Sequence, residues 1–270
     1  MEKKIFATDQ GRIVYWRGGA VGREPALVFL PGLTADHRLF DAQTAFFEPE
    51  RTVLTWDAPG HGESRPFAMR HALADWAEWL HNILEREGIE RPVLVGQSMG
   101  GYVAQCYLER VPGRLSGFIA IDSAPLQRRY VTAAELWLMR HVGPFYRAYP
   151  WGLLQRDGAR GCAETEHGRQ LMRTMMAVYD KKEYCGLAAA GYALLAGAYG
   201  ADLPYRIDCP ALLLCGARDR AGATRRYNRR WAEEEGLELV WIDGAGHNSN
   251  TDRPELVNGL IAGFLERLGS

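Results

Sequence analysis

The sequence predicts an α/β fold built on a mostly parallel, doubly wound sheet, and two observations carry this prediction. Short, continuously apolar runs recur along the chain, and each ends at Gly, Asp or Pro: residues 26–30, 53–56, 93–95, 118–121, 211–215 and 239–242. Continuous rather than alternating apolarity is typical of strands that are buried on both faces of a parallel sheet. Amphipathic helical patterns, such as those at 73–84 and 257–268, separate or follow these runs. Such alternation of strands and helices favours a sheet with helices on both faces.

Two segments depart from this alternation. Residues 4–8 and 12–16 flank an Asp-Gln-Gly turn, which predicts an antiparallel hairpin at the N-terminus. Residues 125–204 are rich in Arg, Met and aromatic side chains and contain no clear strand. We therefore expect a core formed by residues 1–124 and 205–270, with a helical cap, or lid, inserted at 125–204.

Composition excludes several classes of protein. The 270 residues include 32 basic and 33 acidic side chains, so the formal charge is -1 and there is no broad electrostatic footprint for nucleic acid. A hydrophobic fraction of 47% with 24% charged residues is typical of a globular chain and not of a disordered one.

Cysteines and apolar segments bear on the compartment. The five cysteines are an odd set without a CxxC pair, so we expect neither a zinc site nor a redox motif. Unpatterned thiols are typical of a reduced, cytoplasmic protein, and the first residues lack the apolar stretch of a signal peptide. Residues 184–201 are uncharged, but Ala, Gly and Tyr dominate them, so we expect a packed helix and no membrane partner.

The strongest chemical signal is Gly96-Gln97-Ser98-Met99-Gly100, a G-x-S-x-G motif between an expected strand and an expected helix. A serine in such a strained turn needs small residues two positions away on either side, and Gly96 and Gly100 meet this need. The turn lifts the Ser98 hydroxyl clear of the backbone as a candidate nucleophile. It also places the Met99 amide at a helix N-terminus, where it can stabilise developing negative charge.

A serine hydroxyl needs a general base, and His247 is the best placed of the seven histidines. It lies in the loop that follows the apolar run 239–242, and open α/β sheets place their sites at the carboxyl ends of strands. His61, in a loop after another expected strand, is its main competitor.

The third member of a triad is an acid that falls between Ser98 and His247 and follows a strand. Asp219 ends the segment that contains the run 211–215, so it meets both conditions. Its carboxylate would hold the imidazole in one tautomer and stabilise the imidazolium. Asp122, which follows the run 118–121, is the second candidate.

With these residues in place, the chain resembles the α/β-hydrolase superfamily, in its capped, esterase-like serine hydrolase branch. The matching segments are Pro31-Gly32-Leu33 after one expected strand, residues 57–64 after the next, the Ser98 motif, Asp219 and Gly246-His247. Together they span nearly the whole chain and are specific for the fold and the triad, but only weakly specific for a substrate. In such proteins the segment 57–64 is mainly a structural turn, which disfavours His61 as the base.

The resemblance implies hydrolysis of a small or medium carboxylic ester, lactone or amide through an acyl-enzyme on Ser98, with no metal or organic cofactor. It also implies that the Leu33 amide joins the Met99 amide in an oxyanion hole. Many relatives carry His-Gly where this chain has Pro31-Gly32. The departure alters the loop but keeps the donor, because the amide used belongs to Leu33.

Aromatic and Met side chains of the insertion are candidates for an apolar substrate pocket: Trp137, Phe145, Tyr146, Met175 and Tyr179. Residues of this kind also build the core of a cap, so only some of them need face the substrate. The expected partner is a small acyl molecule with an apolar part. Arginines such as Arg128 and Arg129 would suit an anionic group on it, although solvated surface positions account for them as well.

Two rival hypotheses stay open at this point. One is an enzyme of the same fold that does not cleave esters: a carbon–carbon bond hydrolase, a lyase, or a cofactor-free dioxygenase with a His–Asp dyad, which Asp122 would fit. The other is a ligand receptor that retains the triad. Dehalogenase and epoxide hydrolase chemistry usually needs a carboxylate at the elbow, and Ser98 argues against both.

Overall fold

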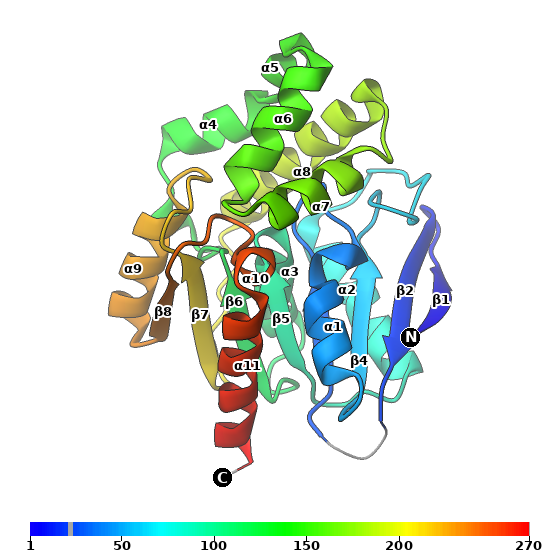
Figure 1. Ribbon diagram of the computed structural model, residues 1–270, viewed down its shortest axis with the longest axis vertical. Coiled ribbons are helices and arrows are strands. Elements are labelled where there is room, and N and C mark those ends of the chain that lie inside the picture. The colour runs from blue at the N-terminus through cyan, green and yellow to red at the C-terminus, as the bar shows by residue number, and fades with distance from the viewer. Residues whose placement is uncertain (21–23, 270) are drawn as a thin grey trace.

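A single eight-stranded sheet organises the computed structural model, which describes residues 1–20 and 24–269 (Figure 1). Its strand order is β1-β2-β4-β3-β5-β6-β7-β8. The strands are β1 (Glu2–Ala7), β2 (Arg12–Gly18), β3 (Leu27–Leu30), β4 (Val53–Asp57), β5 (Val93–Gln97), β6 (Gly117–Ile121), β7 (Ala211–Gly216) and β8 (Glu238–Ile242). Strands β3 to β8 are parallel, while β2 pairs antiparallel with both β1 and β4. The mostly parallel sheet and its N-terminal hairpin are therefore confirmed.

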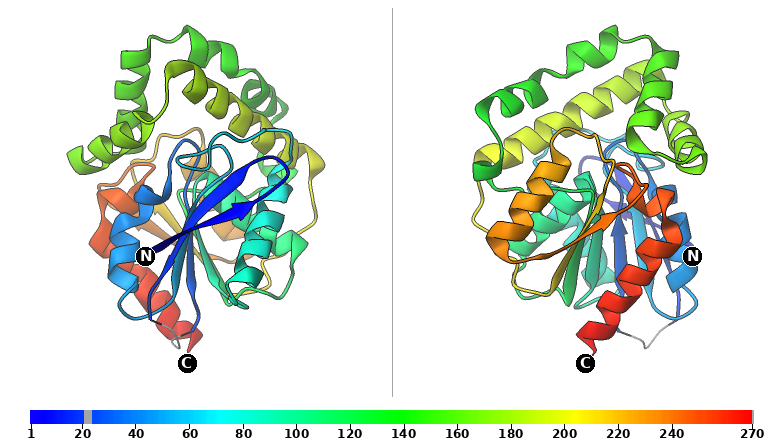
Figure 2. Two further views of the ribbon diagram at one scale, coloured as in Figure 1. Left: turned by 90° about the vertical axis from the view of Figure 1, so that its right-hand side faces the viewer. Right: turned by 60° about the vertical axis from the view of Figure 1, so that its left-hand side comes forward.

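Helices cover both faces of the sheet, with α2, α3 and α9 on one side and α1 and α11 on the other (Figures 1 and 2). In the core these are α1 (Asp41–Phe47), α2 (Leu73–Arg86), α3 (Met99–Arg110), α9 (Thr224–Glu235), α10 (Ser249–Asp252) and α11 (Pro254–Leu268), with a short 3-10 helix η1 (His37–Phe40). The buried side chains form two clusters, one on each side of the sheet.

Side chains point alternately to the two faces of the sheet along each buried strand, and this explains why the apolar runs in the sequence are continuous. In β5, Leu94 belongs to the cluster under α2 and α3, whereas Val93 and Val95 belong to the cluster under α1 and α11. Successive side chains of a strand point to opposite faces, so a strand covered on both faces needs apolar residues at every position. Helix α2 instead buries one stripe, with Leu73, Trp76, Ala77, Leu80, Ile83 and Leu84 at helical spacing.

Five helices lie between β6 and β7 in the chain, over the carboxyl ends of the parallel strands (Figure 2). We call them the cap helices: α4 (Ala133–His141), α5 (Gly143–Ala148), α6 (Trp151–Cys162), α7 (Glu166–Met176) and α8 (Lys181–Ala201), preceded by a 3-10 turn η2 (Arg128–Tyr130). The division of the chain into a core and a cap unit at 125–204 stays a prediction.

The long helix α8 contains the uncharged stretch 184–201. A capping box starts it: Asp180 Oδ1 accepts a hydrogen bond from the Glu183 amide at 2.8 Å, and Glu183 Oε2 accepts one from the Asp180 amide at 3.0 Å. Helices α4 and α5 pack against α8. Within the described part of the chain, no helix is both long and apolar enough to cross a membrane.

Helix α3 begins in direct contact with the end of β3, and glycine permits this approach. A Cβ atom built on Gly100 would lie 1.9 Å from the carbonyl oxygen of Leu30. A Cβ on Gly101 would lie 2.4 Å from the hydroxyl of Ser123, which follows β6. The start of α3 is therefore fixed against two neighbouring strands by close backbone packing.

We expect Gly100→Ala to lower the free energy of unfolding by about 3 kcal/mol, because the added methyl group forces α3 away from Leu30. Urea unfolding measures the change. Gly259→Ala in α11 is the matched control: its Cβ would meet nothing within 4 Å, and alanine should stabilise that helix by about 0.5–1 kcal/mol. Equal stabilities of the two variants would contradict the packing argument.

Candidate active site

Ser98 occupies a strained turn between the end of β5 and the start of α3. Its backbone angles are φ 48° and ψ -114°, a region that non-glycine residues rarely adopt. Three hydrogen bonds hold the turn: the Ser98 amide donates to the Ile121 carbonyl at 2.9 Å, and the Ser98 carbonyl accepts from the Gly101 amide at 3.0 Å and the Ser123 hydroxyl at 2.8 Å. The strand, turn and helix expected around the motif are present.

The hydroxyl of Ser98 lies at one end of a chain of side-chain hydrogen bonds. His247 Nε2 is 2.9 Å from Ser98 Oγ, and His247 Nδ1 is 2.9 Å from Asp219 Oδ2. The side chain of Asp219 is fully buried, and its Oδ1 accepts a bond from the Ala221 amide at 2.7 Å. Gln97 Nε2 donates to the His247 carbonyl at 2.8 Å and so fixes the histidine loop against the elbow. The structure thus brings the three sequence-predicted residues together.

The environment of His247 favours its protonated form. Burial lowers the pKa of the imidazole, but the charge and hydrogen bond of Asp219, followed by the charge of Asp122, outweigh it and raise the pKa above 6.5. An imidazole with a raised pKa is a stronger base toward the serine proton. It is in its neutral, proton-accepting form only at a pH above that raised value.

Asp122 contacts the backbone and not the imidazole. Its Oδ1 accepts a hydrogen bond from the Gly216 amide at 2.6 Å, and its Oδ2 accepts one from the Ser249 amide at 2.8 Å. Burial, followed by the charge of Asp219, raises the pKa of Asp122 to about 7. Asp122 therefore ties the end of β7 to the turn that follows His247, beneath the triad.

His61 is placed for a structural role. It is fully buried, its Nδ1 lies 3.1 Å from the Pro59 carbonyl, and its ring meets Trp76 edge-on. Burial lowers its pKa. The structure therefore does not bring this second candidate base to Ser98.

The loop after β3 lies against the elbow. A Cβ on Gly32 would lie 2.2 Å from Gln97 Oε1 and 3.0 Å from Ser98 Cβ, so the backbone ahead of Leu33 touches the nucleophile's turn. Thr34 follows with φ 64°. The side chain of Leu33 packs on Gly191 of α8, where a Cβ would come within 2.2 Å of it. The two expected oxyanion donors belong to these adjoining segments, since Leu33 follows Gly32 and Met99 is the first residue of α3. Their role stays a prediction.

The five cap residues predicted to bind substrate occupy different environments. Trp137 and Phe145 are 58% and 63% exposed, and Trp137 stacks on His141. Met175 and Tyr179 are buried against core loops: Met175 Sδ is 3.5 Å from the Asp36 amide nitrogen, and the Tyr179 hydroxyl accepts a bond from the Gly62 amide at 2.8 Å. Tyr146 is half-buried. Their role in substrate binding stays a prediction.

Sequence reasoning missed two tyrosines of α8 in this region. Tyr184 lies between Tyr146 and Tyr179, with ring centroids 6.4 and 6.1 Å away, and its hydroxyl is 3.3 Å from Thr34 Oγ1. Tyr192 lies 6.2 Å from Tyr146. These rings form an aromatic cluster above the loop that carries Leu33. Tyr184 and Tyr192 are eight residues apart, so they lie on the same face of one helix, and this spacing could have indicated the cluster. We weighed residues 184–201 only as a possible membrane span, because they are uncharged.

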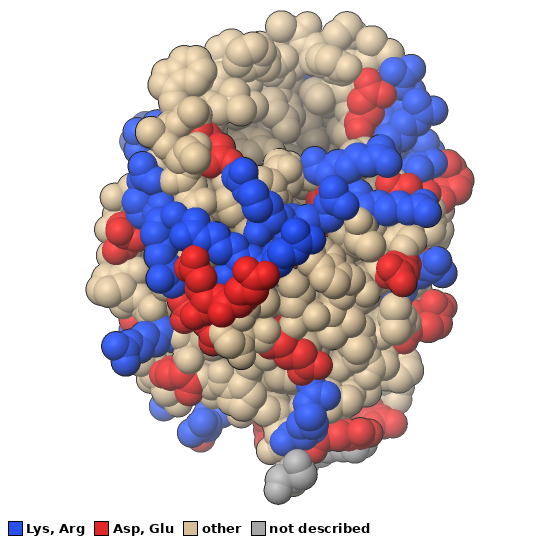
Figure 3. Space-filling view, turned by 90° about the vertical axis from the view of Figure 1, so that its left-hand side faces the viewer, with Lys and Arg blue, Asp and Glu red and all other residues tan. Residues whose placement is uncertain are grey.

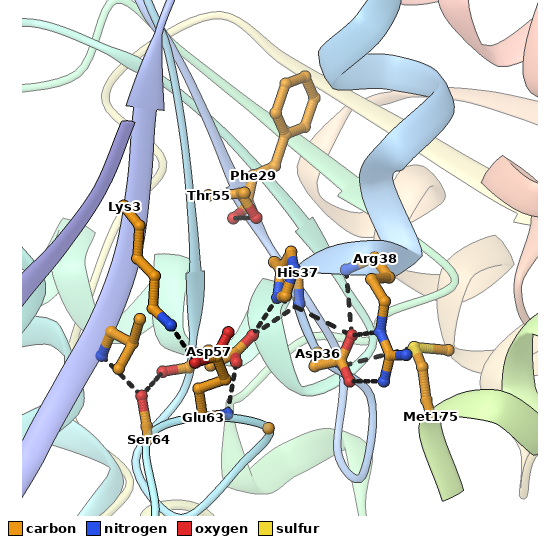
Figure 4. Close-up of polar contacts among 12 residues, drawn as sticks. Lys3, Phe29, Asp36, His37, Arg38, Thr55, Asp57, Glu63, Ser64 and Met175 are labelled. Atoms are coloured by element: carbon orange, nitrogen blue, oxygen red, sulfur yellow. Dashed lines mark hydrogen bonds and ion pairs between the residues drawn. The ribbon is translucent and has the colours of Figure 1, made fainter. Parts of the chain in front are cut away.

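A cluster of polar side chains holds the residues that follow Leu33 and Thr34 in the loop after β3 (Figure 4). Asp57 Oδ1 accepts hydrogen bonds from the amide and the Nδ1 of His37, both at 2.8 Å, and its Oδ2 accepts one from the Glu63 amide at 2.7 Å. Asp36 Oδ1 and Oδ2 accept bonds from the Arg38 guanidinium at 2.9 and 2.5 Å. Burial lowers the pKa of His37, but its bond to Asp57 and the nearby carboxylates prevail and raise it.

Two groups of residues have the spacing of metal ligands: Asp36, His37 and Asp57, and Asp122, Cys215 and Asp219. In both groups every carboxylate oxygen already accepts a hydrogen bond from a protein donor. These hydrogen bonds account for the close spacing of the carboxylates in both groups.

Comparison with known proteins agrees with this architecture. A family model described as the alpha/beta hydrolase family matches residues 27–260. Carboxylesterase YbfK of Bacillus subtilis is 24% identical over 264 residues, which cover 89% of this chain and 80% of that protein. Monoacylglycerol lipase abhd6-B of Xenopus laevis is 27% identical over 298 residues, which cover 100% of this chain and 84% of the lipase. The enol-lactonase from Burkholderia xenovorans superposes with a TM-score of 0.77 at 22% identity, over 97% of this chain and 100% of the lactonase.

The fold and the site define a class of hydrolases, and the match over residues 27–260 places the protein within it. The chain belongs to the alpha/beta hydrolase family. The likeness to the enol-lactonase, at 22% identity, shows the fold alone.

We expect the two buried aspartates near His247 to differ in their effect on turnover. Asp219→Asn should lower kcat about 10³- to 10⁴-fold, because the amide cannot stabilise the imidazolium, and Asp122→Asn should lower it less than tenfold. Ester hydrolysis at saturating substrate measures both. The rising limb of the pH profile should have its midpoint above pH 6.5 and move lower in Asp219→Asn, since Asp219 raises the pKa of His247. Similar losses in the two variants would contradict the assignment.

Asp57→Asn should destabilise the fold in a pH-dependent way, because the amide cannot accept all three hydrogen bonds. A histidine whose pKa is raised on folding stabilises the protein below its unfolded pKa, and this stabilisation is lost as the pH rises through the raised value. The loss of unfolding free energy should therefore be larger at pH 6, about 2 kcal/mol, than at pH 9. Urea unfolding at both values tests this, and in a His37→Gln background the difference between them should vanish.

Proposed function

We propose that the protein is a serine hydrolase that cleaves a small or medium carboxylic ester, lactone or amide through an acyl-enzyme on Ser98. The observation that carries the proposal is the continuous hydrogen-bonded chain from Ser98 Oγ through His247 to Asp219, with 2.9 Å at each link. A hydroxyl, an imidazole and a buried carboxylate in this order form the unit that activates serine for attack on a carbonyl.

The reaction follows from the positions of these groups. Ser98 Oγ attacks the substrate carbonyl carbon while its proton passes to His247 Nε2. The oxyanion that forms is stabilised by the Met99 and Leu33 amides, and Asp219 stabilises the imidazolium. His247 then gives the proton to the leaving oxygen or nitrogen. Water, deprotonated by His247, attacks the acyl carbon, and Ser98 leaves with the returned proton.

Several observations support the proposed substrate class. Two of the relatives are named as a carboxylesterase and a monoacylglycerol lipase. The aromatic cluster around Tyr184 places apolar side chains next to the Leu33 loop. The position of Asp122, bonded to two backbone amides, disfavours the rival His–Asp dyad.

The proposed partner is a small acyl molecule, with the cytoplasm as the proposed compartment. All five cysteines are free thiols, which agrees with a reducing environment. The proposed catalytic cycle uses side chains, backbone amides and water.

A fluorophosphonate probe tests the proposal, since it forms a covalent bond only with an activated serine. We expect labelling at Ser98, and we expect Ser98→Ala to abolish labelling and to lower the hydrolysis of 4-nitrophenyl hexanoate about 10⁴-fold or more while the thermal midpoint stays close to that of the wild type. Ser116→Ala, which changes a serine at the opposite end of the sheet, should leave both unchanged. Labelling that persists in Ser98→Ala would refute the proposal.

A further inference from the structure

The charged side chains of helix α9 are placed unfavourably for the helix dipole, with arginines near its N-terminus and glutamates near its C-terminus. Arg225, Arg226, Arg229 and Arg230 lie in its first two turns, and its last turn ends in three glutamates at 233–235. No acidic residue lies in the first turn, no basic residue lies in the last, and the N-cap Ala223 provides no side-chain cap. Cations near a helix N-terminus and anions near a C-terminus both destabilise the helix. Such an arrangement indicates that the arginines serve something other than the stability of α9.

Two of these arginines have no carboxylate partner among the residues that the structure describes. Arg225 Nη1 donates to the Ala217 carbonyl at 2.9 Å, and the Arg229 guanidinium lies 5.9 Å from the centre of the Trp241 ring. Both side chains line a shallow surface pocket together with Trp241 and Asp243. The pocket therefore presents two guanidiniums that are free to bind a further anion.

The loop that supplies Asp219 to the triad extends this positive surface. Arg218 and Arg220 flank Asp219, and their side chains are 62% and 74% exposed. They share a single carboxylate, Glu164, at 3.7 and 3.8 Å. The positive charge is thus adjacent in the chain to the residue that orients His247.

We call Arg218, Arg220, Arg225, Arg226 and Arg229 the arginine rim. Figure 3 shows a hollow in the upper half of this face and a band of basic side chains directly below it. Arg226 forms an ion pair with Glu135 of α4 at 3.1 Å. The rim therefore contacts α4 at Glu135 and the turn between α6 and α7 at Glu164. Of these five guanidiniums, those of Arg218 and Arg220 lie near Glu164 and that of Arg226 lies near Glu135.

We propose that the arginine rim recruits acyl substrates that carry a carboxylate remote from the scissile bond, such as half-esters or lactones of dicarboxylic acids. The inference rests on the proposed function and narrows its substrate class. A cluster of guanidiniums raises the local concentration of anions and orients a carboxylate through paired N–H donors. Arg218 and Arg220 place part of this cluster next to Asp219, which is bonded to His247. The overall charge of -1 gives no sign of this local cluster of basic side chains, because it counts residues without regard to where they lie.

A matched pair of substrates tests the inference. 4-Nitrophenyl hydrogen adipate and 4-nitrophenyl hexanoate have acyl chains of equal length and differ by one terminal carboxylate. We expect the ratio of their kcat/KM values to fall about tenfold in Arg225→Gln/Arg229→Gln. We expect a similar fall for the wild type when NaCl rises from about 50 mM to about 500 mM, since salt screens exposed charges.

Arg110→Gln/Arg114→Gln is the matched control, because it removes the same charge from two exposed, ion-paired arginines at and beyond the C-terminal end of α3. The substrate ratio should not change in this variant.

Arg225→Glu separates recruitment from a structural role. It places an acid in the first turn of α9, so the thermal midpoint should rise while the substrate ratio falls further. A purely structural role for Arg225 would instead lower the midpoint.

The outcomes separate this inference from the proposed function. If hexanoate hydrolysis depends on Ser98 but the substrate ratio responds neither to salt nor to the rim variants, the inference is overturned and the proposed function stands. If hydrolysis of neither ester depends on Ser98, both are overturned.

Discussion

The strained turn at Ser98 is the constraint on which the arrangement of the site depends. A positive φ at a non-glycine residue is unfavourable, so the turn persists only because its surroundings hold it. Hydrogen bonds to Ile121 and Ser123 tie it to β6 and the residues that follow, and the contact between Gly100 and Leu30 presses α3 onto β3. One turn thereby joins three parallel strands at their carboxyl ends, which is where the loops carrying the other site residues also converge.

Two aspartates with similar sequence contexts have separate roles because their donors differ. Asp219 accepts a bond from an imidazole, and Asp122 accepts bonds from two backbone amides. Each carboxylate raises the proton affinity of His247, but only Asp219 also orients its ring. The mutual repulsion of two buried carboxylates is one cause of the raised pKa of Asp122, so Asp122 and Asp219 are electrostatically linked.

Charge is distributed locally in this protein in a way that its total conceals. The near-neutral balance of 32 basic and 33 acidic residues indicated no broad electrostatic footprint over the whole chain. The fold gathers arginines from α9 and from the loop after β7 onto one face, beside the hollow under the cap helices. Selectivity in our proposal therefore has two sources: apolar and aromatic surface on the cap side, and positive charge on the core side.

The sequence by itself determined the sheet, the hairpin, the elbow and the chain order Ser98, Asp219, His247, because these depend on local patterns: continuous apolarity, glycine spacing and the loops that follow strands. It favoured Asp219 over Asp122 and His247 over His61 but left both alternatives open, because the donors that occupy a side chain come from segments distant in the chain. The environments of Trp137 and Tyr184 were equally undetermined, since a helix has several faces and its neighbours choose which one is buried. Only the tertiary structure decided these points, because burial, hydrogen-bond partners and local charge are properties of packed segments.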